Sequence, residues 1–228
     1  MSPEPRLIEV RAKVLKQNDV LAHALREQFR SSGVYVVSLV SSPGSGKTAF
    51  LESLLSRLSS EHRVAALVGD LSTENDAARL RRAAPCVKQI TTGTICHLDA
   101  QMVQRALDEW ELTNLDFLFI ENVGNLVCPS SYDLGEELRV ILLSTTEGED
   151  KPLKYPTIFN SADVAVITKM DLAVAAEFNL EAATQNIAGV RPGMRIFKVS
   201  SKNGQGVDEF CSFLHAQLET SRIPAVQK

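Results

Sequence analysis

A glycine-rich segment that ends in Lys-Thr follows the apolar run Val34–Val40. The run reads as a buried strand, and Ser45–Leu58 reads as a helix. A strand, a glycine-rich turn, Lys-Thr and a helix together form the pattern of a phosphate-binding P-loop. The backbone N–H groups of such a loop surround a nucleotide phosphate, and the helix N-terminus favours its negative charge. The residues predicted to hold the nucleotide are Gly44, Ser45, Gly46, Lys47, Thr48 and Ala49.

Two side chains of this loop carry specific chemistry. Lys47 is expected to reach the β- and γ-phosphates and to assist hydrolysis, and the Thr48 hydroxyl is expected to ligate Mg²⁺. The usual pattern G-x-x-x-x-G-K-[ST] places glycine where this chain has Ser41. A chance glycine-rich turn is the alternative, and the position between a strand and a helix argues against it.

Two further apolar runs end in acids. Glu121 ends the strand-like run Phe117–Ile120 and has Gly124 three residues on, as in a D-x-x-G switch with Glu replacing Asp. We expect Glu121 to hold Mg²⁺ and Gly124 to approach the γ-phosphate. Asp70 follows the run Val64–Val68 and would bind Mg²⁺ or orient the attacking water. The alternative for each acid is a helix cap.

A segment after the apolar run Val164–Ile167 indicates the base. Thr168-Lys169-Met170-Asp171 matches the N-K-x-D pattern with Thr in place of Asn. One carboxylate, here that of Asp171, accepts both the N1–H and the 2-amino group of guanine, whereas adenine offers no such pair. The stem of Lys169 would lie over the base. Ser201 and Lys202, in a loop after a later strand, would touch the guanine carbonyl.

Thiols and an imidazole follow two strands that should lie at the same sheet edge. Cys96-His97 follows the run Val87–Ile90, and Cys128 follows Phe117–Ile120. Thiolate plus imidazole suits Zn²⁺ or Ni²⁺ better than Mg²⁺. Neighbouring residues on a strand point to opposite faces, so Cys96 and His97 can share one metal only from a turn.

Three ligands leave a tetrahedral ion incomplete. Water, a second subunit or a metal-delivery partner would supply the fourth. The alternative for this set is a pair of small buried thiols beside an unrelated histidine. The remaining cysteines and histidines are expected to be structural, namely Cys86, Cys211, His23, His62 and His215.

Composition narrows the class of protein. The 228 residues carry a net charge of −4, so no basic surface indicates nucleic acid. No apolar run approaches the ~18 residues of a transmembrane helix, and the N-terminus lacks the layout of a signal peptide. Four scattered cysteines do not form a disulfide framework. We therefore expect a cytoplasmic protein without membrane or nucleic-acid partners.

Apolar runs alternate with helical stretches from residue 34 onward, which is typical of a parallel α/β sheet with helices on both faces. The sequence predicts an N-terminal helical arm over 1–33 and one nucleotide-binding domain over 34–228. Within the arm, Asn18-Asp19 is expected to cap the start of a second helical segment. Helices are expected near 48–59, 74–83, 98–110, 172–188 and 206–219, and strands at Val34–Val40, Val64–Val68, Val87–Ile90, Phe117–Ile120, Val140–Leu143, Val164–Ile167 and Arg195–Val199. The polar stretch Ser144–Pro156 is predicted to be an irregular functional or interface loop.

Read together, these segments resemble the HypB family of hydrogenase nickel-incorporation GTPases. The similar segments are Leu39–Thr48, Gly69-Asp70, Asn75–Arg79, Thr92–Asp99, Glu121–Pro129, Thr145, Glu147, Gly148, Lys151–Pro156 and Thr168–Asp171. The Cys-His-Leu-Asp and Gly-Asn-Leu-Val-Cys-Pro pieces are specific to that family, whereas the P-loop is not. The similar segments cover most of residues 34 to 215.

The resemblance implies a P-loop NTPase of the SIMIBI class that hydrolyses GTP to GDP and supplies nickel for hydrogenase assembly. It implies that Cys96, His97 and Cys128 bind Ni²⁺ or Zn²⁺ at a dimer interface that GTP and metal promote. It also implies maturation partners such as a nickel-delivery protein and the hydrogenase large subunit. The chain lacks the N-terminal Cys-x-x-Cys-Gly-Cys site and the His-rich stretch of some members.

Three alternatives remain open. One is a urease-type nickel GTPase, whose expected Cys-Pro-His does not occur here. The second is a non-enzymatic metal-binding scaffold with a structural P-loop, and the third is an ATP-dependent kinase. The role of Lys151 or Lys154, which would reach the phosphates of a partner subunit, also remains open.

Overall fold

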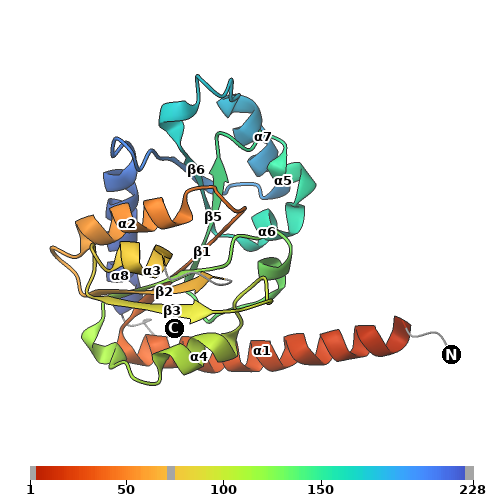
Figure 1. Cartoon of the computed structure of the whole chain (residues 1–228), viewed down its shortest axis with the longest axis vertical. Helices are drawn as coiled ribbons and strands as arrows, with labels where there is room; N and C mark the ends of the chain where they lie inside the picture. Colours follow the sequence, from red (N-terminus) through yellow and green to blue (C-terminus); the bar gives the residue numbers. More distant parts are fainter. Residues whose placement is uncertain (1–3, 71–74, 224–228) are drawn as a thin grey trace.

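A seven-stranded sheet forms the centre of the molecule (Figure 1). The computed structural model describes residues 4–70 and 75–223, and only the backbone of residues 4–8 and 11. Every neighbouring pair of strands runs parallel, in the order β3-β2-β4-β1-β5-β6-β7. The strands are β1 Tyr35–Ser41, β2 Val64–Asp70, β3 Cys86–Thr91, β4 Phe117–Glu121, β5 Leu138–Ser144, β6 Val164–Thr168 and β7 Arg195–Lys198. Their carboxyl ends, where ligands bind in such sheets, share one edge.

Helices cover both faces of the sheet, which is why its central strands read as continuous apolar runs. In β1, Val37 and Leu39 belong to one buried cluster, whereas Val36 and Val40 belong to clusters on the other face. The alternation of side chains along a strand produces this division.

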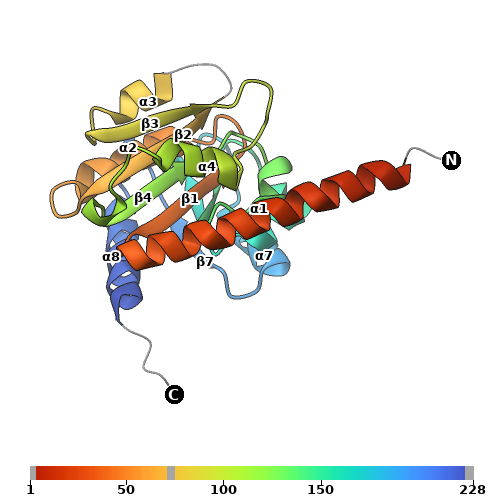
Figure 2. The same cartoon turned by 90° about the horizontal axis from the view of Figure 1, so that it is seen from below.

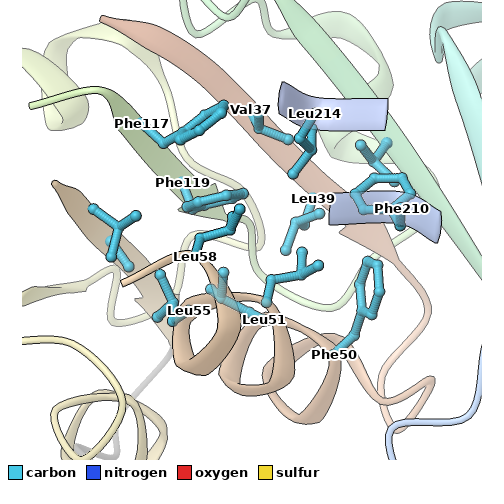
Figure 3. Close-up of a cluster of buried hydrophobic side chains, with 14 of the residues drawn as sticks. Val37, Leu39, Phe50, Leu51, Leu55, Leu58, Phe117, Phe119, Phe210 and Leu214 are labelled. Atoms are coloured by element: carbon cyan, nitrogen blue, oxygen red, sulfur yellow. The ribbon is translucent and has the colours of Figure 1, made fainter. Parts of the chain in front are cut away.

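The first face is covered by α2 Lys47–Leu58, α3 Asn75–Leu80 and α8 Val207–Arg222. Figure 3 shows Leu55 and Leu58 of α2 facing Phe119 of the sheet, and Phe50 of the same helix lies against Phe210 of α8. Helix α2 follows the P-loop directly, so this packing fixes the loop against the sheet.

The opposite face carries two groups of helices. Helices α1 Glu4–Ser32 and α4 Ala100–Leu107 cover its first half, and α6 Pro156–Ser161 and α7 Leu180–Val190 cover its second half. The amino-terminal part of α1 extends beyond the body of the molecule (Figure 2). Within the described part of the chain, none of the helices combines the length and the apolar character needed to cross a membrane.

The predicted arm is one continuous helix, so the expectation of a second start at Asn18-Asp19 is wrong. The Asn18 side chain is buried and acts between elements instead. It donates to the carbonyl oxygen of Asp133 at 2.9 Å and accepts from the backbone N–H of Ala100 at 2.9 Å. Asn18 therefore ties α1 to the start of α4.

Several predicted boundaries also change. The segment 172–188 is not one helix, because a 3₁₀ turn over Met170–Leu172 is followed by turns and α7 begins only after the cap Asn179. The expected helix 98–110 is shorter, since Asp99 caps it and it ends at Leu107. The expected helix 74–83 is also shorter, since α3 ends at Leu80 and residues 81–83 form a turn, and Glu74 lies outside the described residues.

The stretch Ser144–Pro156 is less irregular than predicted. It contains the single-turn helix α5 Lys151–Lys154, and α6 begins at Pro156. Prolines at the first turns of both helices suit these starts, because proline tolerates that position. Two further 3₁₀ turns cover Leu112–Asn114 and Cys128–Ser131.

Candidate nucleotide site and neighbouring metal centre

The P-loop lies between β1 and α2 and is held by left-handed glycines. Gly44 and Gly46 have φ of 73° and 93°, a region that side chains disfavour. The buried Lys47 ammonium donates to the Ser41 hydroxyl at 3.0 Å. Ser41, which replaces the usual glycine, also contacts the Ser45 hydroxyl. The serine therefore belongs to the loop's own hydrogen bonds.

Lys47 is surrounded by acids that it does not contact directly. Burial lowers the pKa of its ammonium, and the charges of Glu121, Asp76, Glu147 and Asp70 raise it in opposition. These four carboxylates therefore lie around one cation at the carboxyl edge of the sheet. Asp76 and Glu147 were not singled out as site residues in the sequence.

The two predicted magnesium ligands Thr48 and Glu121 meet in the structure. The Thr48 hydroxyl donates to Glu121 Oε1 at 2.7 Å. The other oxygen, Oε2, is buried and has no hydrogen-bond partner among the residues described. Burial raises the pKa of Glu121 to about 7, against the lowering effect of Lys47. A hydroxyl beside an unsatisfied carboxylate oxygen fits Mg²⁺, which prefers oxygen ligands.

Asp70 ends β2, next to the strand that ends in Glu121. Val68 pairs with Glu121 in the sheet register, so Asp70 lies two residues beyond that pair. The charge of Asp70 is among the smaller effects that raise the pKa of Glu121, as expected for two carboxylates at the ends of neighbouring strands. The position suits either of the predicted roles, a magnesium ligand or a group that orients water.

Gly124 packs directly against the P-loop. A Cβ atom at this position would lie 2.9 Å from the Cα of Pro43 and 3.0 Å from its nitrogen. Such a distance is shorter than real contacts allow, so any side chain would displace the loop. The glycine of the predicted switch therefore touches the segment that surrounds the phosphates.

The expected base-binding residues border the same loop. Thr168 donates to the carbonyl oxygen of Ser45 at 2.7 Å, and the Lys169 ammonium donates to that of Gly44 at 2.7 Å. Asp171 Oδ1 accepts a hydrogen bond of 2.5 Å from the Ser200 hydroxyl. The sequence indicated Ser201 and Lys202 of this turn but not Ser200, whose buried hydroxyl orients the carboxylate.

Glu147 lies beside the P-loop from the loop after β5. Its Oε2 accepts from the Ser42 hydroxyl at 2.8 Å, and its buried Oε1 has no partner in the described parts of the chain. Burial raises the pKa of this carboxyl. The Thr-Glu-Gly segment was the one sequence signal that pointed to this position.

Cys96, His97 and Cys128 converge, as the sequence predicted. One ligand atom from each lies within 4.8 Å of the others, and the two sulfur atoms are 2.9 Å apart without a disulfide bond between them. Cys96 and His97 occupy a bend after β3, and Cys128 begins a 3₁₀ turn. The bend removes the strand geometry that would have separated the first two side chains.

The His97 ring is positioned for a ligand. It stacks on Tyr132 with ring centroids 3.9 Å apart, and its buried Nδ1 has no hydrogen-bond partner in the described structure. Burial lowers the pKa of His97, which favours the neutral, metal-binding imidazole. Two thiols and an unsatisfied imidazole nitrogen fit Ni²⁺ or Zn²⁺. Nothing in the sequence indicated that Tyr132 would stack on His97.

The buried side chain of Asn122 connects the two sites. Its Oδ1 accepts from the backbone N–H of Leu98 at 3.0 Å and from that of Val123 at 2.9 Å. Asn122 follows Glu121, and Leu98 follows His97. The predicted magnesium ligand Glu121 and the loop that carries Cys96 and His97 are thus separated by one side chain.

Comparison with known proteins agrees with this geometry. Residues 35–198 match the model of the CobW/HypB/UreG nucleotide-binding domain. The hydrogenase maturation factor HypB of Azotobacter chroococcum is 42% identical over 94% of this chain and 70% of its own length. The hydrogenase/urease maturation factor HypB of Helicobacter hepaticus is 43% identical over 91% and 86%.

A solved structure shows the same arrangement of elements. HypB from Helicobacter pylori, crystallised in complex with nickel, superposes with a TM-score of 0.85 at 40% identity. The match covers 93% of this chain and 100% of that one. The sequence comparison and the structure comparison therefore both match HypB proteins.

Proposed function

The chain belongs to the CobW/HypB/UreG family of P-loop GTPases, and from this premise we propose that it hydrolyses GTP to control nickel delivery during hydrogenase maturation. Family membership and the all-parallel sheet confirm the predicted SIMIBI-class fold. The observation that carries the proposal is the metal centre of Cys96, His97 and Cys128, joined through Asn122 to the nucleotide site.

Hydrolysis converts GTP and water to GDP and phosphate. The P-loop N–H groups and Lys47 bind the phosphates, and Asp70 orients the water or the magnesium. Thr48 and Glu121 would hold Mg²⁺, which would supply positive charge to the phosphate oxygens. Gly124 senses the γ-phosphate, and its contact with Pro43 supports this assignment.

Guanine selection rests on Asp171. Its carboxylate accepts hydrogen bonds from the two donors of guanine, and the Ser200 hydroxyl orients that carboxylate by donating to Oδ1. Lys169 crosses the P-loop, where its stem can cover the base. Ser201 and Lys202 complete the loop around the guanine carbonyl.

Nickel is the cargo of the neighbouring centre, and zinc, which prefers the same ligands, is its competitor. Three protein ligands leave a tetrahedral position open, and an open position suits transfer to another protein. The thiols need a reducing compartment, so we place the protein in the cytoplasm. A nickel-delivery protein and a hydrogenase large subunit are the proposed partners.

A second copy of the chain is the proposed source of the missing ligands. Two incomplete centres that face each other across a two-fold axis would complete each other's coordination. Ile95 and Val127, which precede the two cysteines, are exposed by 40% and 61% and would be covered in such a dimer. The loop Ser144–Pro156, with Lys151 or Lys154, is the second proposed interface element.

Urease is a second candidate recipient. The Helicobacter hepaticus relative bears the name of a hydrogenase/urease maturation factor, although this chain lacks the Cys-Pro-His pattern. Nickel transfer from the loaded protein to each apoenzyme precursor distinguishes the two recipients.

Sedimentation of the untagged protein with Ni²⁺ or Zn²⁺, with and without a GTP analogue, tests the proposal. We expect both ligands to promote dimerisation, and each to tighten the other by thermodynamic linkage. Cys96→Ala/Cys128→Ala should lose the metal response, whereas the matched control Cys86→Ala/Cys211→Ala should keep it. A parent that stays monomeric throughout, or a ligand variant that still dimerises with metal, contradicts the proposal. GTP turnover indistinguishable from the solvent rate would support the non-enzymatic scaffold, and a strong ATP preference the kinase.

A further inference from the structure

Two histidines meet at the edge of the sheet opposite the nucleotide site. His62 lies in the turn between α2 and β2, and His215 lies on α8. His62 Nε2 and His215 Nδ1 are 3.3 Å apart, with the ring planes inclined by 46°. They are 153 residues apart in the sequence, so only the fold brings them together.

Rigid elements position both rings. The His62 ring packs edge-on against Phe117, with centroids 5.2 Å apart, and Phe117 is fully buried at the start of β4. The backbone N–H of His62 donates to the carbonyl oxygen of Leu58 at 2.8 Å, which fixes its turn to the end of α2. Leu214 and Leu218 anchor the α8 turn that carries His215 in the core.

Oxygen and sulfur side chains surround the pair. The rings line an open cavity of about 370 Å³ that is also lined by Glu61, Cys211 and Ser212. Glu61 is exposed and forms no ion pair with the residues the structure describes, and its carboxylate does not lie within 4.8 Å of both ring nitrogens. Asp208 of the same cavity is already paired with Arg57 at 2.5 Å.

We propose that His62 and His215 are the protein ligands of a second site for a divalent transition metal, completed by water. Metal–nitrogen bonds of about 2.0–2.1 Å at a tetrahedral angle place two ligand nitrogens roughly 3.3 Å apart. The 3.3 Å between His62 Nε2 and His215 Nδ1 matches that edge, and because it is also a hydrogen-bonding distance, a bound metal would replace an N–H···N bond between the rings. Imidazole nitrogens suit Ni²⁺, Cu²⁺ and Zn²⁺.

Cys211 belongs to the cavity but not to the proposed ligand set. It lies one helical turn before His215, on the same side of α8. Its sulfur does not lie within 4.8 Å of both ring nitrogens, since Cys96, His97 and Cys128 form the one such three-ligand group among the residues described. The second site is therefore a nitrogen–oxygen site, which binds more weakly than the thiolate centre and fills after it.

Equilibrium dialysis of the full, untagged chain tests this site in a Cys96→Ala/Cys128→Ala background. We expect this background to bind about one equivalent of Co²⁺ or Ni²⁺. Adding His215→Ala, a surface substitution, should abolish that equivalent, and adding His62→Ala should do the same. His23→Ala, on the exposed face of α1, and Cys211→Ala should leave it unchanged. These variants keep all nucleotide-binding residues, so unchanged GTP binding verifies that they are folded.

The cobalt spectrum supplies a second readout. The nitrogen–oxygen site should give ligand-field bands without sulfur-to-cobalt charge transfer, and the bands should vanish with His215→Ala. A background variant that binds no metal overturns the proposal. It is equally overturned if His215→Ala binds as much metal as the background, or if a charge-transfer band disappears with Cys211→Ala. The Cys96–Cys128 centre is absent from every arm, so these outcomes do not depend on it.

Discussion

Asn122 Oδ1 accepts a hydrogen bond of 3.0 Å from the backbone N–H of Leu98, and this bond joins the end of β4 to the loop that carries His97. The Leu98 side chain also covers the end of β2, because a Cβ atom on Gly69 would lie 2.8 Å from its Cγ. If a γ-phosphate displaces the end of β4, the hydrogen bond between Asn122 and Leu98 would therefore transmit that displacement to the proposed metal ligand His97.

Asn122→Leu should uncouple the two sites. Leucine has a similar shape but no acceptor, so the N–H groups of Leu98 and Val123 lose their partner, at a cost of about 1–3 kcal/mol in the free energy of unfolding. Metal affinity measured with and without a GTP analogue should become the same. Asn114→Ala, which removes only a bond to Glu111, should retain the coupling. Coupling as strong in Asn122→Leu as in the parent would exclude this route.

Asp171→Asn should shift the base preference from GTP toward XTP, because xanthine carries a carbonyl in place of the 2-amino donor. The lost charge-assisted hydrogen bonds should cost roughly 2–4 kcal/mol of GTP binding free energy. Ser200→Ala should weaken GTP binding less, since it removes only the group that orients the carboxylate. Titration calorimetry with both nucleotides measures the effect, and unchanged GTP affinity in Asp171→Asn would refute the guanine assignment.

Lys47→Ala should abolish turnover, because it removes the charge that neutralises the β- and γ-phosphates. Asp70→Ala should lower kcat more than nucleotide affinity. Phosphate release and nucleotide titration separate the two effects. Equal losses of kcat and nucleotide affinity, or no loss of kcat, would show that Asp70 has only a structural role at the end of β2.

Gly124→Ala should weaken nucleotide binding by displacing the P-loop, since the added methyl group would meet the backbone of Pro43 at 2.9 Å. The matched control is Gly189→Ala in α7, where an added Cβ meets nothing within 4 Å. That control should stabilise the protein by about 0.5–1 kcal/mol, because alanine favours a helix interior over glycine. Thermal unfolding with and without GDP measures both. Parental affinity in Gly124→Ala would show that the loop yields without consequence.

Asp116→Asn should destabilise the fold in a pH-dependent way. Hydrogen bonds from Arg63, with a further bond from Arg222, hold the pKa of the Asp116 carboxyl well below its usual range. Its contribution of about 1–3 kcal/mol is therefore fully present above the unfolded pKa of about 4 and is lost as the pH falls below it.

Urea unfolding at pH 7 and pH 3 measures this effect. The stability difference between parent and Asp116→Asn should shrink at the lower pH. The exposed carboxylate of Glu219 provides the control, and Glu219→Gln should change stability by less than about 0.5 kcal/mol at either pH. A difference that stays constant between the two pH values would show that the charge of Asp116 is not responsible.

Local pattern was sufficient for the strands and for placing the candidate nucleotide site at their carboxyl ends. Runs such as Val34–Val40 lie in a sheet buried on both faces, so apolar continuity alone indicated them. The helix boundaries were less predictable, because tertiary contacts decide them. Asn18 was expected to cap a helix, and it instead bonds to Asp133 and Ala100, residues far away in the chain.

The sequence by itself determined the P-loop, the positions of Thr48, Glu121 and Asp171, and the thiol and imidazole groups at strand ends. These features follow from residue types at short spacings, because backbone conformation and ligand chemistry are local. Only the tertiary structure decided which side chains meet: Ser200 with Asp171, Tyr132 with His97, Asn122 with Leu98, and His62 with His215. Such pairs depend on the order of strands and the packing of helices, since no spacing along the chain encodes a distance of a few ångströms between residues that lie far apart in it.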